Sequence, residues 1–209
     1  MNPVGTVSGI AAPLDLADVD TDQLIPARFL RRPRAQGYAI ALMHDLRYDP
    51  QENERPGFVL NQPLFRQAKI LVADRNFGGG SARESAVWAL MDWGIACVIA
   101  SSFADIFYNS SSKQGLLLVR QSQEAVEHLR AQLHAQPGAK MSVDLAAQTL
   151  TGPDGTTYHF EIEPSIKRRL QLGLDDIQET QQFADRIDAF EVAYKARRPW
   201  LFRNDDHTT

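Results

Sequence analysis

Short apolar runs alternate with helix-periodic segments in the middle of the chain. The runs, rich in Val, Ile and Leu, cover residues 69–74, 96–100 and 116–119. The intervening segments Arg83–Trp93 and Ser102–Gln114 have the apolar spacing of helices, and Gly115 is typical of a helix end. Strands separated by helices of this length indicate βαβ units and a parallel sheet.

The segments on either side of this core are less regular. Before it, the pattern predicts an opening strand at Thr6–Pro13 and an irregular region at 31–63 that holds a helix-compatible patch at Tyr38–Leu46. After it, the predicted elements are a helix at Gln123–Gln136, strand-like runs at Met141–Leu150 and Thr156–Ile162 around a Gly152–Gly155 hairpin turn, and helices at Pro164–Leu172 and Asp175–Arg197. Asn204–Thr209 is expected to be a frayed tail.

Composition and charge exclude several classes of protein. The 209 residues are 44% hydrophobic and 23% charged, as in folded soluble proteins. A net charge of −4 argues against a protein that tracks nucleic acid. No apolar run approaches the roughly 18 residues of a membrane span, and the first basic residue is Arg28, so no signal peptide is expected. We therefore expect a cytoplasmic protein.

Cys97 is the only cysteine, and it lies within the apolar run Ile95–Ala100. A disulfide framework, a zinc finger and a self-ligated iron–sulfur cluster are thereby excluded within this chain. The five histidines show no metal-ligand spacing, so no metal is assigned. Cys97 itself is expected to be a core residue.

The most informative segment is the glycine turn Asn76–Ala86, between a predicted strand and a predicted helix. Consecutive glycines followed by a helix N-terminus make an anion site, and Arg83 favours a carboxylate as the anion. The spacing matches neither a P-loop nor G-x-G-x-x-G. Ser81 and Glu84 also form a capping box, and the pattern alone favours capping over a catalytic role for Ser81.

Three further segments have a structural and a functional interpretation. Asp18–Asp22 resembles the start of a calcium loop but lacks its glycine and final glutamate, so a cluster of Asx turns is favoured. Arg28–Arg34 is a dense basic patch, which is either a solvated loop or a contact for an acidic ligand. Ser110–Gly115 is typical of a helix C-terminus, with Lys113 complementing the dipole.

Three segments together resemble the small subunit of 3-isopropylmalate dehydratase, an aconitase-related isomerase of leucine biosynthesis. They are Asp18–Leu30, Asn76–Leu90 and Ser102–Asn109, and the likeness continues through the hairpin to Ala189–Leu201. The order and spacing of the three motifs make the resemblance specific.

The resemblance implies an α/β fold: a swivelling β/β/α three-layer domain with a βαβ core and a C-terminal helical extension. It implies one domain over 1–209, with an irregular substrate loop at about 28–63 and the hairpin and helices at about 141–200. It also implies a separate large subunit that carries a [4Fe–4S] cluster, so no cofactor is expected in this chain. In that family the cluster acts as a Lewis acid, and the small domain contributes the base and the anion-binding groups.

The resemblance also assigns roles to residues. Ser81 would take a proton from carbon and Arg83 would hold a substrate carboxylate, with Gly80 and Ala82 beside them in contact with the substrate. The loop that would help read the substrate's side chain comprises Phe29, Leu30, Arg31 and Arg32. The implied reaction dehydrates 2-isopropylmalate to 2-isopropylmaleate and rehydrates it to 3-isopropylmalate, and this resemblance favours a functional Ser81 over the capping interpretation.

The chain departs from the family's usual Gly-Cys-Gly-Ser-Ser-Arg-Glu-His-Ala at three positions. Gly79, Ala82 and Ser85 replace the Cys, the second Ser and the His, whereas Ser81 and Arg83 persist. Elsewhere, Leu118 stands where the family commonly has Pro.

These departures and the basic loop leave alternatives open. Arg31 and Arg32 are more basic than an isopropyl group requires, which suggests another di- or tricarboxylic hydroxy acid as substrate. The changed glycine turn suggests a non-catalytic binding subunit. A stand-alone serine hydrolase is disfavoured, because no His and acid can be paired with Ser81 and the turn is not G-x-S-x-G.

Overall fold

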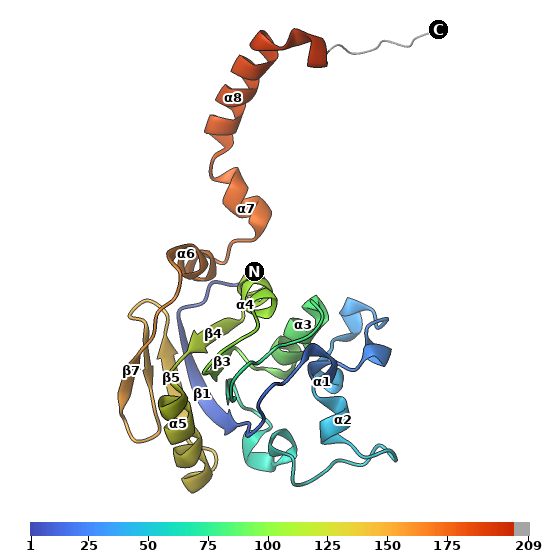
Figure 1. Cartoon of the computed structure of the whole chain (residues 1–209), viewed down its shortest axis with the longest axis vertical. Helices are drawn as coiled ribbons and strands as arrows, with labels where there is room; N and C mark the ends of the chain where they lie inside the picture. Colours follow the sequence, from blue (N-terminus) through green and yellow to red (C-terminus); the bar gives the residue numbers. More distant parts are fainter. Residues whose placement is uncertain (203–209) are drawn as a thin grey trace.

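The computed structural model describes residues 1–202, which contain a seven-stranded mixed sheet (Figure 1). The strands lie in the order β4-β3-β2-β1-β5-β6-β7. Their bounds are β1 Thr6–Pro13, β2 Ile70–Val72, β3 Cys97–Ala100, β4 Leu117–Arg120, β5 Lys140–Asp144, β6 Thr149–Thr151 and β7 Thr157–His159. β1 joins the two halves of the sheet, because its C-terminal part pairs parallel with β2 and its N-terminal part pairs antiparallel with β5.

The longer helices follow the strands of the parallel half. The helices are α1 Thr21–Leu24, α2 His44–Arg47, α3 Glu84–Trp93, α4 Asp105–Gln114, α5 Gln123–Ala135, α6 Pro164–Leu172, α7 Asp176–Gln181 and α8 Ala184–Arg197. Single 3-10 turns occupy Ala27–Phe29, Arg34–Gln36, Ala39–Ala41, Val59–Asn61, Pro63–Phe65 and Pro199–Phe202. None of the helices in residues 1–202 is long and apolar enough to cross a bilayer.

Both faces of the parallel strands are buried, which explains why their sequences are continuously apolar. Alternate residues such as Leu71 and Val98 belong to one hydrophobic cluster, which α3 and the 38–65 region cover. The intervening residues, Cys97 among them, belong to a second cluster under α5 and α6. The structure therefore has three layers, and both the α/β fold class and the parallel βαβ core are confirmed. Cys97 is fully buried, and burial raises the pKa of its thiol.

A buried arginine organises the irregular region. Arg47 is 2% exposed, and its guanidinium stacks on the Trp93 ring at 4.0 Å. Its Nε donates to Asn61 Oδ1 at 3.1 Å, and its Nη1 donates to the Leu42 carbonyl at 3.2 Å. Burial lowers the pKa of Arg47, and these neutral acceptors offset part of the cost of desolvating the charge.

Three expected elements are divided in the structure. The patch at Tyr38–Leu46 is a 3-10 turn and the short helix α2, separated by Met43 in a left-handed conformation (φ 47°). The run Met141–Leu150 forms two antiparallel strands instead of one, because the chain reverses between Asp144 and Gln148 (φ 55°). Asp144 accepts a hydrogen bond from the Ala147 amide in that turn.

The C-terminal helix is also divided, into α7 and α8, with the break at Gln182 and Phe183. No glycine or proline marks this break, so the sequence pattern has no signal for it. Figure 1 shows α7 and α8 leading away from the sheet. Lys113 donates to Asp176 at 2.7 Å and holds the base of this arm against α4. The expected tail Asn204–Thr209 lies outside the described residues.

Candidate active site

The glycine turn connects β2 to α3, and aromatic side chains hold its first part. Phe77 is buried and contacts Phe103 and Phe107 edge-on. Gly78 has φ +83°, and a Cβ there would lie 2.7 Å from Phe107 Cβ, so only glycine fits this position. The chain therefore passes close over α4 before it turns toward α3.

The predicted capping box at Ser81 is wrong. Helix α3 begins at Glu84, with Arg83 as an N-cap residue that makes no side-chain capping bond. Glu84 instead accepts a hydrogen bond from Gln114 of α4. Within residues 1–202, Ser81 Oγ makes no hydrogen bond, and Ser81 is exposed. The hydroxyl is therefore free for another partner.

Unpaired backbone amides lie on either side of Ser81 along the chain. In the described part of the chain, none of the N–H groups from Gly80 to Ser85 donates to a protein acceptor. Six consecutive unpaired donors at the positive end of a ten-residue helix attract an anion. The expected anion site therefore has its donors in place.

Arg83 points toward α1, where Asp22 holds it. Its Nη1 donates to Asp22 Oδ1 at 2.5 Å and to the Ile25 carbonyl at 3.2 Å. The Arg83 side chain is only 15% exposed. Its Nε and Nη2 make no hydrogen bond to residues 1–202, so they remain available as a fork for a carboxylate.

The acidic segment before α1 is a capped turn rather than a calcium loop. Asp20 accepts from the Gln23 amide at 2.7 Å, and the Gln23 side chain accepts from the Asp20 amide at 3.1 Å. The expected cluster of Asx turns is therefore wrong: Asp20 caps α1 through a capping box, and the side chains of Asp18 and Asp22 accept from residues of the 75–83 segment. Residues 1–202 contain no cluster of three or more His, Cys, Asp or Glu side chains that could hold a metal ion.

The next turn of the same segment contacts the glycine turn. The Thr21 amide donates to the Gly79 carbonyl at 2.9 Å, and the Thr21 hydroxyl donates to the Ser81 carbonyl at 2.8 Å. Sequence reasoning did not assign Thr21 or Asp22 to the site. The motif itself was visible, but spacing along the chain does not reveal a contact between residues 60 positions apart.

Two of the four arginines of the basic patch form ion pairs within residues 1–202. Arg28 forms a two-point ion pair with Asp45, and Arg34 forms one with Asp92 at 2.6 and 2.9 Å. Arg32 donates to the carbonyls of Gln36 and Gly37. The interpretation of the patch as a solvated loop is therefore correct only in part, because Arg28, Arg32 and Arg34 make hydrogen bonds that stabilise the loop.

The predicted substrate loop lies after α1, next to the patch. Phe29 packs against the ring of His44 at 4.8 Å, whereas Leu30 and Arg31 are exposed. No hydrogen bond among residues 1–202 joins Phe29–Arg32 to Ser81 or Arg83. Ser81, Arg83, Gly80 and Ala82 therefore lie in one turn, whereas the loop follows α1 on a separate segment of the chain.

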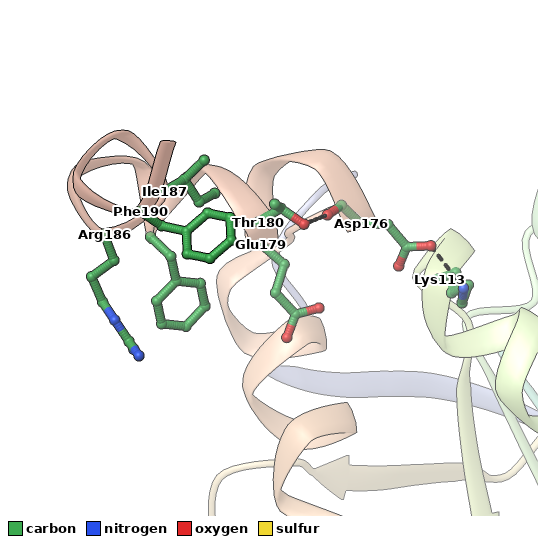
Figure 2. A pocket seen from close by; sticks show the side chains of 8 residues that line it. Lys113, Asp176, Glu179, Thr180, Arg186, Ile187 and Phe190 are labelled. Atoms are coloured by element: carbon green, nitrogen blue, oxygen red, sulfur yellow. Dashed lines mark hydrogen bonds and ion pairs between the residues drawn. The ribbon is translucent and has the colours of Figure 1, made fainter. Parts of the chain in front are cut away.

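One groove of the described residues lies away from Ser81 and Arg83. Figure 2 shows it between α4, α7 and α8, with Lys113 and Asp176 at one end and Phe190 and Ile187 at the other. Its volume is about 740 Å³, and none of the predicted site residues lines it.

Comparison with known proteins assigns the chain to a family. Residues 1–124 match the model of the aconitase C-terminal domain, residues 127–164 match the model LeuD_N, and residues 176–204 match the model of the C-terminal domain of the 3-isopropylmalate dehydratase small subunit. The chain is 47% identical to the 3-isopropylmalate dehydratase small subunit of Roseobacter denitrificans, over 96% of this chain and 100% of that protein. It is 49% identical to that of Jannaschia sp., with the same coverage of both proteins. The chain belongs to the 3-isopropylmalate dehydratase small subunit family.

A solved structure of the same family has the same fold. The crystal structure of 3-isopropylmalate dehydratase (leuD) from Methanocaldococcus jannaschii superposes with a TM-score of 0.63 at 25% identity, covering 89% of this chain and 99% of that one.

The three-layer structure also bears on one departure from the small-subunit motif. At Gly79, where the motif has Cys, an added Cβ would meet no heavy atom within 4 Å. Gly79 is therefore not required by packing, unlike Gly78.

Proposed function

We propose that the chain is the small subunit of a hydro-lyase that isomerises 2-isopropylmalate to 3-isopropylmalate through 2-isopropylmaleate, in leucine biosynthesis. Near-full-length relatives with this name support the assignment. The observation that carries it is the free Ser81 hydroxyl beside unpaired amides and the Arg83 guanidinium. Those groups suit a hydroxy-dicarboxylate better than a nucleotide or a peptide.

Arg83 binds one carboxylate of the substrate. Its free Nε and Nη2 form a planar fork, while Asp22 fixes the orientation of the guanidinium through Nη1. The amides of Gly80 and Ala82 contribute further donors to the same carboxylate. Asp22 offsets part of the positive charge of Arg83, so substrate binding relies on geometry as well as on net charge.

Ser81 acts as the base. The positive end of α3, the unpaired amides and Arg83 together stabilise negative charge on Ser81 Oγ. As an alkoxide, Ser81 Oγ takes the proton from the carbon next to the hydroxyl-bearing carbon as the hydroxyl departs. On rehydration, hydroxide adds to the carbon that lost the proton, and Ser81 returns the proton to the carbon that lost the hydroxyl. In the same proposal, Phe29, Leu30, Arg31 and Arg32 contact the substrate's side chain.

The partner is a large subunit that carries a [4Fe–4S] cluster. This chain does not fit the cluster, because its single cysteine is buried in the core and residues 1–202 contain no three-ligand group. Gly80, Ser81 and Ala82 are exposed, and the partner would exclude water from them. The cytoplasm is the proposed compartment, since an unpaired thiol suits a reducing environment.

The proposal favours isopropylmalate over a more acidic substrate. The chain's near-full-length relatives are named for this activity. Arg28 and Arg34 are paired with Asp45 and Asp92, but Arg31 and Arg32 have no acidic partner in residues 1–202, so the hydroxy-acid panel below decides between the two substrate classes. Dependence of activity on Arg83 separates this function from a non-catalytic binding subunit, whose complex would form without needing Arg83 for activity.

The test uses the two subunits mixed under anaerobic, iron-replete conditions, with absorbance of the unsaturated intermediate as the readout. Ser81→Ala is expected to lower kcat by about 100- to 10,000-fold, whereas Ser142→Ala on β5 is the matched control with unchanged turnover. Arg83→Gln is expected mainly to raise KM. Near-full turnover by Ser81→Ala would remove the base assignment, and a panel of hydroxy acids tests the substrate.

A further inference from the structure

We propose that Thr21 is a positioning residue for Ser81. This inference rests on the proposed role of Ser81 as the base. Thr21 begins α1, is 1% exposed and cannot itself contact the substrate. Its hydroxyl donates to the Ser81 carbonyl at 2.8 Å, and its amide donates to the Gly79 carbonyl at 2.9 Å.

The two bonds hold the glycine turn on both sides of Gly80. The amides of Gly78 and Gly79 donate to the Val19 carbonyl at 2.7 and 3.2 Å, so the first part of the turn has several anchors. Beyond Gly79 the anchoring is sparse. Within residues 1–202, the Thr21–Ser81 bond is the only hydrogen bond made by the backbone of residues 80–82.

The hydrogen bond from Thr21 to the Ser81 carbonyl matters because the preceding residue, Gly80, has a flexible backbone. Gly80 has φ +84°, and its hydrogen atom faces Thr21, since a Cβ there would lie 3.4 Å from Thr21 Oγ1. Glycine does not restrict its own dihedral angles, so the direction of the next residue must be set by contacts. The Thr21 hydroxyl supplies that contact, and it thereby sets where the Ser81 side chain points.

Asp22, the residue after Thr21, positions the side chain of Arg83. Asp22 holds Arg83 from the same turn of α1. The first turn of α1 therefore fixes the base and the carboxylate-binding group relative to each other. Because a displacement of about 1 Å costs about 100-fold in rate, loss of the Thr21 hydroxyl should lower kcat.

Thr21→Val tests the proposal, because valine keeps the shape of threonine and removes the donor. In the reconstituted two-subunit enzyme, Thr21→Val is expected to lower kcat by roughly 10- to 100-fold with a smaller change in KM. Thr21→Ser keeps the hydroxyl and is expected to remain within about 3-fold of the natural chain. Ser112→Ala is the matched control, since it removes another buried hydroxyl that donates to a carbonyl, at 2.9 Å from Asn109 O.

Two further measurements separate positioning from general destabilisation. In the Ser81→Ala background, Thr21→Val is expected to cause no further loss of kcat, because the group it positions is gone. In the isolated small subunit, the amides to follow are those of Gly78 and Gly79, which donate to Val19, and that of residue 21, which donates to Gly79. Their hydrogen exchange is expected to rise in Thr21→Val but not in Thr21→Ser or Ser112→Ala.

The outcomes distinguish this inference from the proposed function. If Ser81→Ala retains turnover, the base assignment fails, and hydrogen exchange alone then decides whether Thr21 orders the turn. If Ser81→Ala is inactive while Thr21→Val keeps its kcat, the positioning role of Thr21 is overturned and the proposed function stands. Equal losses in Thr21→Val and Thr21→Ser would also overturn it.

Discussion

Replacing Gly78 by alanine is expected to destabilise the protein far more than replacing its neighbour Gly79. At Gly78 the backbone has φ +83°, which costs an L-residue about 1–2 kcal/mol. The new Cβ would also lie 2.7 Å from Phe107 Cβ, and Phe107 is packed against Phe77. Overpacking of this kind costs about 1–3 kcal/mol, so Gly78→Ala should lose about 2–5 kcal/mol of unfolding free energy.

Gly79 provides the matched control. Its backbone is outside the left-handed region and its Cβ position is empty. Gly79→Ala is therefore expected to be neutral or to stabilise by up to about 1 kcal/mol, because alanine restricts the unfolded chain. Urea unfolding of the small subunit, followed by far-UV circular dichroism, measures both values. A difference below about 0.5 kcal/mol between the two variants, at equal m-values, would refute the packing argument for Gly78.

Two other predictions concern titratable groups. Cys97 is fully buried, and burial raises the pKa of its thiol. Iodoacetamide at pH 8 should therefore label Cys97 only as fast as the chain unfolds. Labelling in native buffer at the rate of a free thiol would contradict its core position. Burial alone would raise the pKa of Asp74, but the Arg75 amide, Gln123 and Arg130 lower it below its ordinary value. The stabilising contribution of Asp74 should therefore be complete at neutral pH and be lost as pH falls below about 4. In Asp74→Asn, the melting temperature should fall less steeply as the pH is lowered below about 4. If the melting temperature of Asp74→Asn depends on pH as that of the natural chain does, the stabilising role of Asp74 is refuted.

The parallel core was predictable because its signal is local. The runs at 69–74, 96–100 and 116–119 are apolar on both faces, and the structure confirms them as β2, β3 and β4. Gly115 ends α4 in a left-handed conformation, as expected for a helix C-terminus. The divided elements lie where no glycine or proline marks the change: at Met43, at the turn after Asp144 and at the break before α8.

The candidate site was predictable in its position but not in its arrangement. The glycine turn is recognisable from its residues alone, and so is Arg83. The capping error arose because Ser81 and Glu84 have the right spacing, yet Gln114 of α4 bonds to Glu84 and the helix begins three residues after Ser81. A capping box is a local pattern, and a contact from another helix overrode it.

Sequence by itself determined the parallel strands and the helices between them, the burial of Cys97 and the family motif around Ser81 and Arg83. These follow from periodicity and residue type, which act over a few neighbouring positions. Only the tertiary structure decided that the Ser81 hydroxyl is free and that Asp22 holds Arg83. It also decided that Thr21 anchors the glycine turn across 60 residues of chain. Such contacts depend on which surfaces the packed layers bring together, and no pattern within a single segment contains that information.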